Sequence, residues 1–415
     1  MVVLKDLAAH HSDHSVLCSL HKGVAKAFSF VALASIASYS HAWDLPTYGD
    51  TSIAMGDTLD FGGQRNRINT DLIGDWQFNA ALTGLGAIQS NAPPGDPRNY
   101  GDISNAQVVI AKPTGMLQLF AIAGYYSIPD LSTNYLRAAT QTKTTWGALP
   151  VAYASIVPND SWSLYVGKLF ALGGAEGTFT YENTNIQRGL LWGQTNSITQ
   201  GVQLNYQDDA WSTSFAWTDG ADSGKYNWLG ISTGYKLSPQ TTITAIWNGA
   251  LSGNPADSAK TPLLQNNSQI TNLLFSYKGD NWGLTPYLQY SVIPSNPTVG
   301  IYGTSNTQGA GLLATYRITP LIDGKPGRKN VTLPFRLEYL NTRGDSGTNP
   351  NNLLYGPNSA AWSATLTPTL QNGAFFCRLE GSYVKALNYA QGSAFGSMGA
   401  APGQARLMIE AGLLY

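Results

Sequence analysis

The residues best suited to chemistry in this sequence are arginines and glutamates that recur at even spacing near the C-terminus. The pairs are Arg336 with Glu338, Arg378 with Glu380, and Arg406 with Glu410. In a β-strand, residues an even number of positions apart point to the same face. Each pair would therefore place a cation beside an anion, either as a charged surface that steers ions or as a mutually neutralising ladder. The equal numbers of positive and negative charges favour the neutralising ladder and predict weak ion selectivity.

A second group of charged and aromatic side chains lies in the Gly-rich stretch 171–194. It contains Glu176, Tyr181, Glu182 and Arg188. A long connection of this kind can fold inward and narrow a pore, and it can equally be an ordinary surface loop. The two glutamates by themselves are weak evidence for calcium. We therefore treat these four residues as a candidate constriction.

Histidine and cysteine chemistry is excluded once the N-terminal segment is set aside. All five histidines lie within residues 1–42, as does Cys18, so that Cys377 is the only cysteine beyond them. A Ser–His or Cys–His catalytic pair cannot then be built, nor can a zinc site that uses histidine. The sequence predicts no catalytic residues, no metal and no cofactor, so we do not expect an enzyme.

The first 42 residues have the pattern of an N-terminal extension followed by a signal peptide. Lys22 and Lys26 precede an apolar stretch over 27–38, and Ser40-His41-Ala42 is a small-x-small cleavage site. We expect cleavage after Ala42. Whether residues 1–20 are translated stays open. Residues 43–74 would form a lead-in that is either periplasmic or lumenal.

The composition narrows the classes of protein further. Charged residues make up 12% of the chain, about half the ~25% of ordinary globular proteins. A formal net charge of −1 gives no indication of the basic surface that nucleic-acid binding requires. Beyond the N-terminus no run of ~18 apolar residues marks a transmembrane helix. The remaining class is a β-rich protein whose apolar side chains are regularly spaced.

Alternation of apolar and polar residues marks the expected strands. In 374–385, for example, Phe375, Cys377 and Leu379 alternate with Arg378 and Glu380. The segments match the ~9–11 residues that cross an outer membrane at a tilt, rather than the ~5–6 of a soluble sandwich. We expect sixteen of them: 75–88, 104–112, 116–126, 150–157, 161–170, 195–206, 210–218, 226–237, 241–250, 268–278, 282–292, 305–317, 331–341, 358–369, 374–385 and 404–415.

The connections between these segments alternate in length. Short connections such as 113–115, 158–160 and 238–240 carry Pro, Gly, Asn and Asp, which favour turns. Longer ones rich in Gly, Pro, Asn and Ser separate them; 219–225 and 318–330 are the exceptions. Short periplasmic turns and long outer loops are typical of an up-and-down transmembrane barrel.

Aromatic residues and the last segment support the same architecture. Tryptophans begin several segments at the short-turn end, where tyrosines end their neighbours, as expected of an interfacial girdle. The last segment places apolar residues on one face and stops at an aromatic residue. It resembles the C-terminal signature by which outer-membrane barrels are recognised for assembly, formed here by Leu407, Ile409, Leu413 and Tyr415.

One family resemblance rests on 164–170 (LYVGKLF), 173–176 (GGAE), 181–185 (YENTN) with Arg188, and 201–206 (GVQLNY). Together they resemble the OmpL-like putative β-barrel porin family. The resemblance implies an outer-membrane porin with few assigned functional residues.

The sequence therefore predicts an all-β protein, a transmembrane up-and-down antiparallel β-barrel of about 16 strands over 75–415 with a water-filled lumen. The expected function is passive diffusion of small hydrophilic solutes or ions across the Gram-negative outer membrane. Expected partners are outer-membrane lipid, the barrel-assembly machinery and the solutes, with no nucleic acid; a homo-oligomer is compatible with the sequence. The alternatives are an adhesin or structural barrel and, with less support, an outer-membrane hydrolase.

Overall fold

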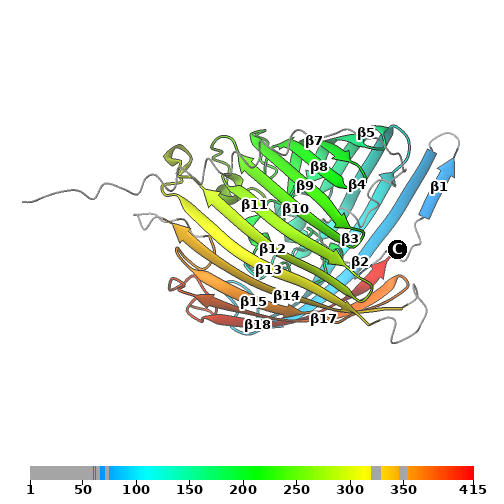
Figure 1. The fold of residues 1–415 in the computed structure, drawn as a ribbon. Helices are drawn as coiled ribbons and strands as arrows, with labels where there is room; N and C mark the ends of the chain where they lie inside the picture. The colour runs from blue at the N-terminus through cyan, green and yellow to red at the C-terminus, as the bar shows by residue number, and fades with distance from the viewer. Residues whose placement is uncertain are drawn as a thin grey trace, which may run out of the picture. The chain divides into compact units, whose positions relative to one another are not determined.

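The computed structural model describes residues 59, 61, 66–70, 74–318, 329–344, 351 and 353–415. The predicted signal segment 1–42 lies outside the described residues, as does most of the lead-in 43–74. The remainder is almost entirely strand and turn (Figure 1).

Eighteen strands are found in the described residues. They are β1 (Asn66–Thr70), β2 (Gly74–Gln89), β3 (Asn99–Lys112), β4 (Leu117–Tyr126), β5 (Val151–Asn159), β6 (Trp162–Phe170), β7 (Ile198–Gln207), β8 (Trp211–Thr218), β9 (Trp228–Ser238), β10 (Thr241–Ala250), β11 (Gln269–Lys278), β12 (Trp282–Ile293), β13 (Ser305–Arg317), β14 (Lys329–Gly344), β15 (Ala360–Leu366), β16 (Thr369–Asn372), β17 (Phe375–Leu387) and β18 (Gly403–Leu414).

The sheet closes on itself because the last strand pairs with the first strand of the wall. Every neighbouring pair is antiparallel, and β18 pairs with β2 in the register Ile409↔Gly86. At the end of this seam Tyr415 and Ala80 exchange two backbone hydrogen bonds. Closure pairs the backbone groups at the strand edges, which lipid could not satisfy.

Sixteen strands make up the wall, as the sequence predicts. The count of eighteen is larger because one wall strand is divided in two and because β1 is additional to the wall. β15 and β16 both pair with β14 and β17, so they are one wall strand interrupted at Pro368. Proline has no N–H to donate to the ladder, which accounts for the break inside the strand expected over 358–369. β1, which was not predicted, pairs with β2 beyond the end of β18.

The burial pattern of the strands is the reverse of that in a soluble sheet. On β17 the apolar Leu379 is 46% exposed and Tyr383 39%, whereas Arg378 is 1% exposed and Glu380 fully buried. A soluble protein would cover the leucine and expose the ions, because burying apolar area is favourable and burying charge is costly. The outer surface is therefore suited to lipid and the inner surface to polar contents.

The predicted aromatic girdle is present as ring pairs at the short-turn end. Trp162 lies 4.9 Å from Tyr206, Trp211 lies 4.6 Å from Tyr235, and Trp282 lies 4.7 Å from Tyr316, measured between ring centroids. The residues of the predicted assembly signal, Leu407, Ile409, Leu413 and Tyr415, are exposed on the outer face. Their role in assembly stays a prediction.

Helical structure is confined to the connections. The α-helices are α2 (Ala138–Thr144) and α3 (Leu263–Asn266), and the 3₁₀ turns are η1 (Thr180–Glu182), η2 (Trp192–Gln194) and η3 (Pro297–Val299). None of the helices in the described residues combines the length and the apolar character needed to cross a bilayer. The two turns η1 and η2 belong to the connection between β6 and β7, which we call the inner loop (171–197).

Candidate functional site

The inner loop lies inside the barrel and packs against its wall. Phe179, Ile186, Leu190 and Leu191 of the loop are fully buried. The loop leaves β6 through two successive glycines, Gly173–Gly174, that have positive φ angles of 150° and 75°. Glycine adopts such angles without the steric cost that a Cβ would bring, which lets the chain turn inward immediately after the strand.

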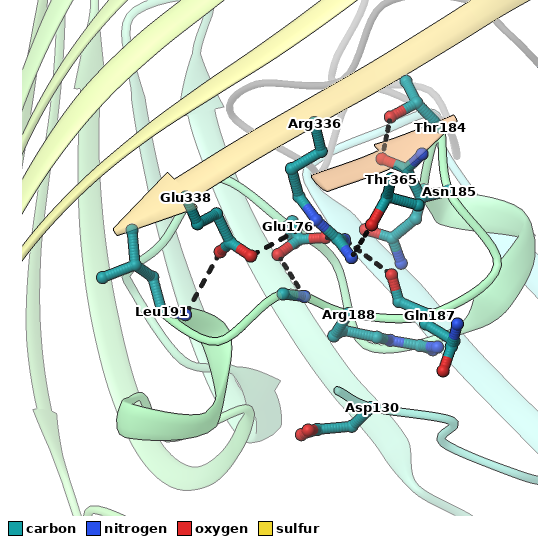
Figure 2. Close-up of polar contacts among 12 residues, drawn as sticks. Asp130, Glu176, Thr184, Asn185, Gln187, Arg188, Leu191, Arg336, Glu338 and Thr365 are labelled. Atoms are coloured by element: carbon teal, nitrogen blue, oxygen red, sulfur yellow. Dashed lines mark hydrogen bonds and ion pairs between the residues drawn. The ribbon is translucent and has the colours of Figure 1, made fainter. Parts of the chain in front are cut away.

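Arg336 and Glu338 extend from β14 to meet this loop (Figure 2). One guanidinium nitrogen of Arg336 lies 2.5 Å from Glu176 Oε1 and donates to the Gln187 carbonyl at 2.6 Å. Its Nε is 3.4 Å from Glu338 Oε2. The arginine therefore bridges a glutamate of the wall and a glutamate of the loop.

Glu338 and Glu380 bind the loop through its backbone amides. The Glu338 carboxylate accepts hydrogen bonds from the N–H groups of Leu190 at 2.9 Å and Leu191 at 3.2 Å. On β17, Glu380 accepts from the N–H groups of Ile186 at 2.5 Å and Gln187 at 3.1 Å. Each pair of successive N–H groups thus ends on one carboxylate, and hydrogen bonds to ionised groups are the stronger ones.

Arg378 and Glu410 form the next contact along the wall. Arg378 Nε lies 2.8 Å from Glu410 Oε2, and its other nitrogens donate to the carbonyls of Asn183 at 2.8 Å and Thr180 at 2.7 Å. Glu410 also accepts from the Thr180 hydroxyl at 2.6 Å. The ion pair therefore holds the first half of the loop.

Arg406 of β18 completes the set by joining two connections. It donates to the Asp130 carbonyl at 2.6 Å and to Gln187 Oε1 at 2.9 Å. The six predicted charges thus meet the predicted loop, and every one of them is 6% exposed or less. Sequence reasoning treated the charges and the loop as separate features, while the structure shows one docking surface.

Arg188 lies at the centre of the loop and is fully buried. It donates to the carbonyls of Pro129, Ile186 and Thr178 and lies 5.8 Å from the ring centroid of Trp192. Burial lowers the pKa of Arg188 to about 10, so the side chain remains a cation at neutral pH. The candidate residue therefore organises the loop from within.

Tyr181, another candidate residue, links the loop to the lead-in segment. Its ring lies 5.8 Å from that of Phe61 in an edge-to-face arrangement. Phe61 and Leu59 pack with the buried cluster that contains Phe179 and Tyr126. The sequence left open whether 43–74 is lumenal or periplasmic, and the described part of it reaches the inner loop.

Glu182 differs from the other candidate carboxylates because one of its oxygens has no hydrogen-bond partner in the described chain. Its Oε2 accepts the Phe179 N–H at 2.8 Å, while its Oε1 is buried without a partner. Burial raises the pKa of Glu182 to about 7. The protonated side chain therefore suits the docked loop better than the ionised one.

This raised pKa gives an expected pH dependence. The stabilisation from protonated Glu182 is fully present below the ordinary pKa of about 4.5 and is lost as pH rises through about 7. We expect trypsin to cut the loop after Arg188 more readily at pH 8 than at pH 6. Glu182→Gln cannot ionise, so the ratio of its cleavage rate to that of the parent chain at the same pH should fall from pH 6 to pH 8, and a ratio that stays constant would contradict the assignment.

The space that the loop leaves open lies along the opposite wall. A cavity of about 290 Å³ faces β5–β10, and its lining includes Tyr165, Gln203, Asn205 and Ser214. A second cavity of about 700 Å³ lies among the long connections and is lined in part by Trp192. A smaller space of about 20 Å³, which we call the neck, lies between the two ends of the loop and β7–β11 and shares lining residues with both cavities.

Sequence reasoning did not identify the residues that line this neck. Asn248 and Asn272 are single amides on strands with no charge nearby in sequence, and Thr195 belongs to the end of the loop. Their one sequence signal is the absence of charge on the polar faces of these strands away from the short-turn ends. Among the described residues, no three His, Cys, Asp or Glu side chains come together closely enough to bind a metal ion.

Comparison with known proteins gave one family and several solved structures. The family model described as Putative beta-barrel porin-2, OmpL-like matches residues 73–415. No curated protein matches the chain. Three of the solved structures share its fold at 12% identity.

Three of these structures cover most of both chains. An anion-selective porin from Comamonas acidovorans covers 82% of this chain and 99% of its own, with a TM-score of 0.54. OmpT, an outer membrane protein of Vibrio cholerae, covers 84% and 100% with a TM-score of 0.53. Salmonella typhi OmpF, in complex with daunomycin, covers 84% and 100% with a TM-score of 0.51.

Proposed function

This chain belongs to the Putative beta-barrel porin-2, OmpL-like family, and we propose that it is a passive channel for small hydrophilic solutes. Family and fold together indicate an integral outer-membrane porin. Passive diffusion and weak ion selectivity are the parts that we add. The proposal assigns no catalysis to the chain, and residues 43–415 contain no histidine for the usual acid–base mechanisms.

The observation that carries the proposal is the arrangement of space inside the barrel. The inner loop docks on β14, β17 and β18, while cavities of about 290 and 700 Å³ remain beside the narrow neck. A barrel of sixteen strands is wide enough to enclose water. A loop that narrows such a lumen without filling it supports a size-limited passage.

The six charges under the loop support the weak selectivity. Two of the three arginines pair with two of the three glutamates, Arg336 with Glu338 and Arg378 with Glu410. Glu380 and Arg406 are instead hydrogen-bonded to neutral groups of the loop and of the neighbouring connection. Charges that are paired and covered contribute little field to a passing ion, because selectivity depends on groups that line the open pore. The neutralising interpretation of these residues is therefore the one that we propose.

The experiment is single-channel recording of the purified protein in planar lipid bilayers. We expect stepwise increases in conductance that are small for a barrel of this size, because the neck is narrow. The same protein after heat denaturation serves as the control. Silence from protein whose heat-modifiable migration shows a folded barrel would contradict the proposal and favour an adhesin or structural role.

A further inference from the structure

Charge is distributed unequally around the wall of the barrel. Strands β5–β12 carry three charged residues in their whole length, Lys168, Lys236 and Lys278, and no carboxylate. Lys236 and Lys278 lie at the short-turn ends of β9 and β11. Lys168 lies at the opposite end of β6 and pairs with Asp222 at 3.6 Å. The middle of this half of the barrel is therefore free of side-chain charge.

The open neck lies against this uncharged half. It is bounded by residues from β7 to β11 and by the two ends of the inner loop. A volume of about 20 Å³ has room for about one or two water molecules. A solute as large as a sugar passes here only when the loop ends move apart, and it must then exchange most of its hydration shell for contacts with the wall.

Asn272 shows what kind of contact the neck provides. Its side chain is 1% exposed, and neither its amide oxygen nor its amide nitrogen has a partner in the described structure. A buried polar group without a partner is unfavourable, so this amide is suited to a guest molecule that both donates and accepts hydrogen bonds. Asn248, also in the neck, donates to the Leu172 carbonyl of the loop.

No carboxylate is among the described residues that line the neck. Asp219 is fully buried and accepts hydrogen bonds from the Thr199 hydroxyl at 3.1 Å and from backbone N–H groups of residues 200 and 224. Glu176 and Glu182 line a separate recess of about 50 Å³ beside the loop. Glu176 is paired with Arg336, and Glu182 titrates near pH 7, so pH 6 is the condition for testing the neck itself.

The cavity of about 290 Å³ next to the neck is likewise lined mainly by uncharged polar and aromatic side chains. Gln203, which lines both spaces, donates to Asn205 at 2.7 Å, and Asn205 bonds with the Ser163 and Ser214 hydroxyls at 3.2 and 2.8 Å. The stacked rings of Tyr153 and Tyr165, 5.0 Å apart, form part of the lining. Amides, hydroxyls and aromatic faces are the groups that contact sugars and other polyols.

We propose that the passage along β7–β11 selects small uncharged polyhydroxylated solutes over ions of the same size. This inference rests on the proposed channel function. An ion entering the neck loses hydration at a cost of several kcal/mol and finds no opposite charge there. A sugar exchanges its hydrogen bonds with water for bonds with the amides and hydroxyls of the wall, so its cost is much smaller.

The test is efflux from proteoliposomes loaded with radiolabelled arabinose or with arabinonate, the acid of the same carbon skeleton. Both run at pH 6, with potassium on both sides and valinomycin to hold the membrane potential at zero. We expect arabinose to leave at least about tenfold faster, which corresponds to ~1.4 kcal/mol. Equal rates would overturn the inference and leave the channel intact, whereas no efflux of either solute would overturn the channel function.

Two substitutions test where the selection occurs. Asn272→Asp and, independently, Gln203→Glu place a carboxylate in the passage with little change in shape. Either substitution should shift the reversal potential in a potassium chloride gradient toward cation preference. Either should also slow the efflux of arabinonate further. Asn99→Asp, at the exposed start of β3, is the matched control and should shift neither. If both folded variants behave like Asn99→Asp, the passage does not run along β7–β11.

Discussion

Replacing Arg378 with methionine should release the inner loop from the wall. The substitution leaves the Glu410 carboxylate buried without its cation and removes the donors to the Thr180 and Asn183 carbonyls. Breaking a buried ion pair in this way costs ~3–5 kcal/mol. In the undocked loop Glu410 is hydrated by lumenal water, so the cost falls on docking rather than on the barrel.

Trypsin provides a direct measurement of this release, because Arg188 is the one basic residue in 171–197. When cleavage follows the population of the open loop, ~3–5 kcal/mol makes it about 150- to 5000-fold faster. The channel should also conduct more, since the undocked loop no longer narrows the lumen. Both the cleavage rate and the conductance are measured on folded protein in detergent or vesicles.

Two further variants separate charge loss from loss of the contact. Arg378→Met combined with Glu410→Leu should be cut more slowly than the single variant, because no unpaired carboxylate remains in the wall. Arg343→Met, at the exposed end of β14, removes an arginine that lies away from the loop and should leave the rate unchanged. A single Arg378 variant cut at the parental rate would show that the ion pair does not hold the loop.

Gly189→Val should be the second strongly disruptive change. A Cβ at Gly189 would lie 2.1 Å from Glu338 Oε1 and 2.4 Å from its carboxyl carbon. Glu338 cannot turn away cheaply, because it also binds two loop amides, the Ser363 hydroxyl and Arg336. Overpacking costs ~1–3 kcal/mol, and each loop N–H left without its acceptor adds ~1–3 kcal/mol.

The expected result for Gly189→Val is a correctly assembled barrel with an undocked loop and raised conductance. Gly381→Val is the control, because a Cβ at this outward-facing glycine of β17 meets nothing within 4 Å. Heat-modifiable migration should be the same for both variants. Parental conductance and parental trypsin resistance in Gly189→Val would mean that Glu338 does not clamp residues 189–191.

The docked loop connects these predictions with the proposed solute class. Because the loop covers the charged strands β14, β17 and β18, what remains open is the uncharged wall. Releasing the loop with Arg378→Met should therefore both widen the lumen and uncover Arg336, Glu338 and Glu380. Such a channel should lose the preference for arabinose over arabinonate as its conductance rises, since a wide lumen lets ions keep their hydration shells.

The sequence by itself determined the wall of this protein. Alternation such as Phe375, Arg378 and Leu379 assigns each side chain to lipid or lumen, because a strand has two faces and a charge in lipid costs ~2–4 kcal/mol. The short turns and the tryptophan–tyrosine ends fix the strand number. The long connection 171–194 was recognisable as a candidate because of its length and its two glutamates.

Only the tertiary structure decided what the lumenal charges contact and where the passage runs. Arg336 meets Gln187 across 149 residues of sequence, and Thr180 meets Glu410 across 230. The partners are mostly backbone N–H and carbonyl groups of the loop, which every residue carries and no sequence pattern marks. The proposed passage is the space that the docked loop leaves empty, and its position follows from which wall the loop binds.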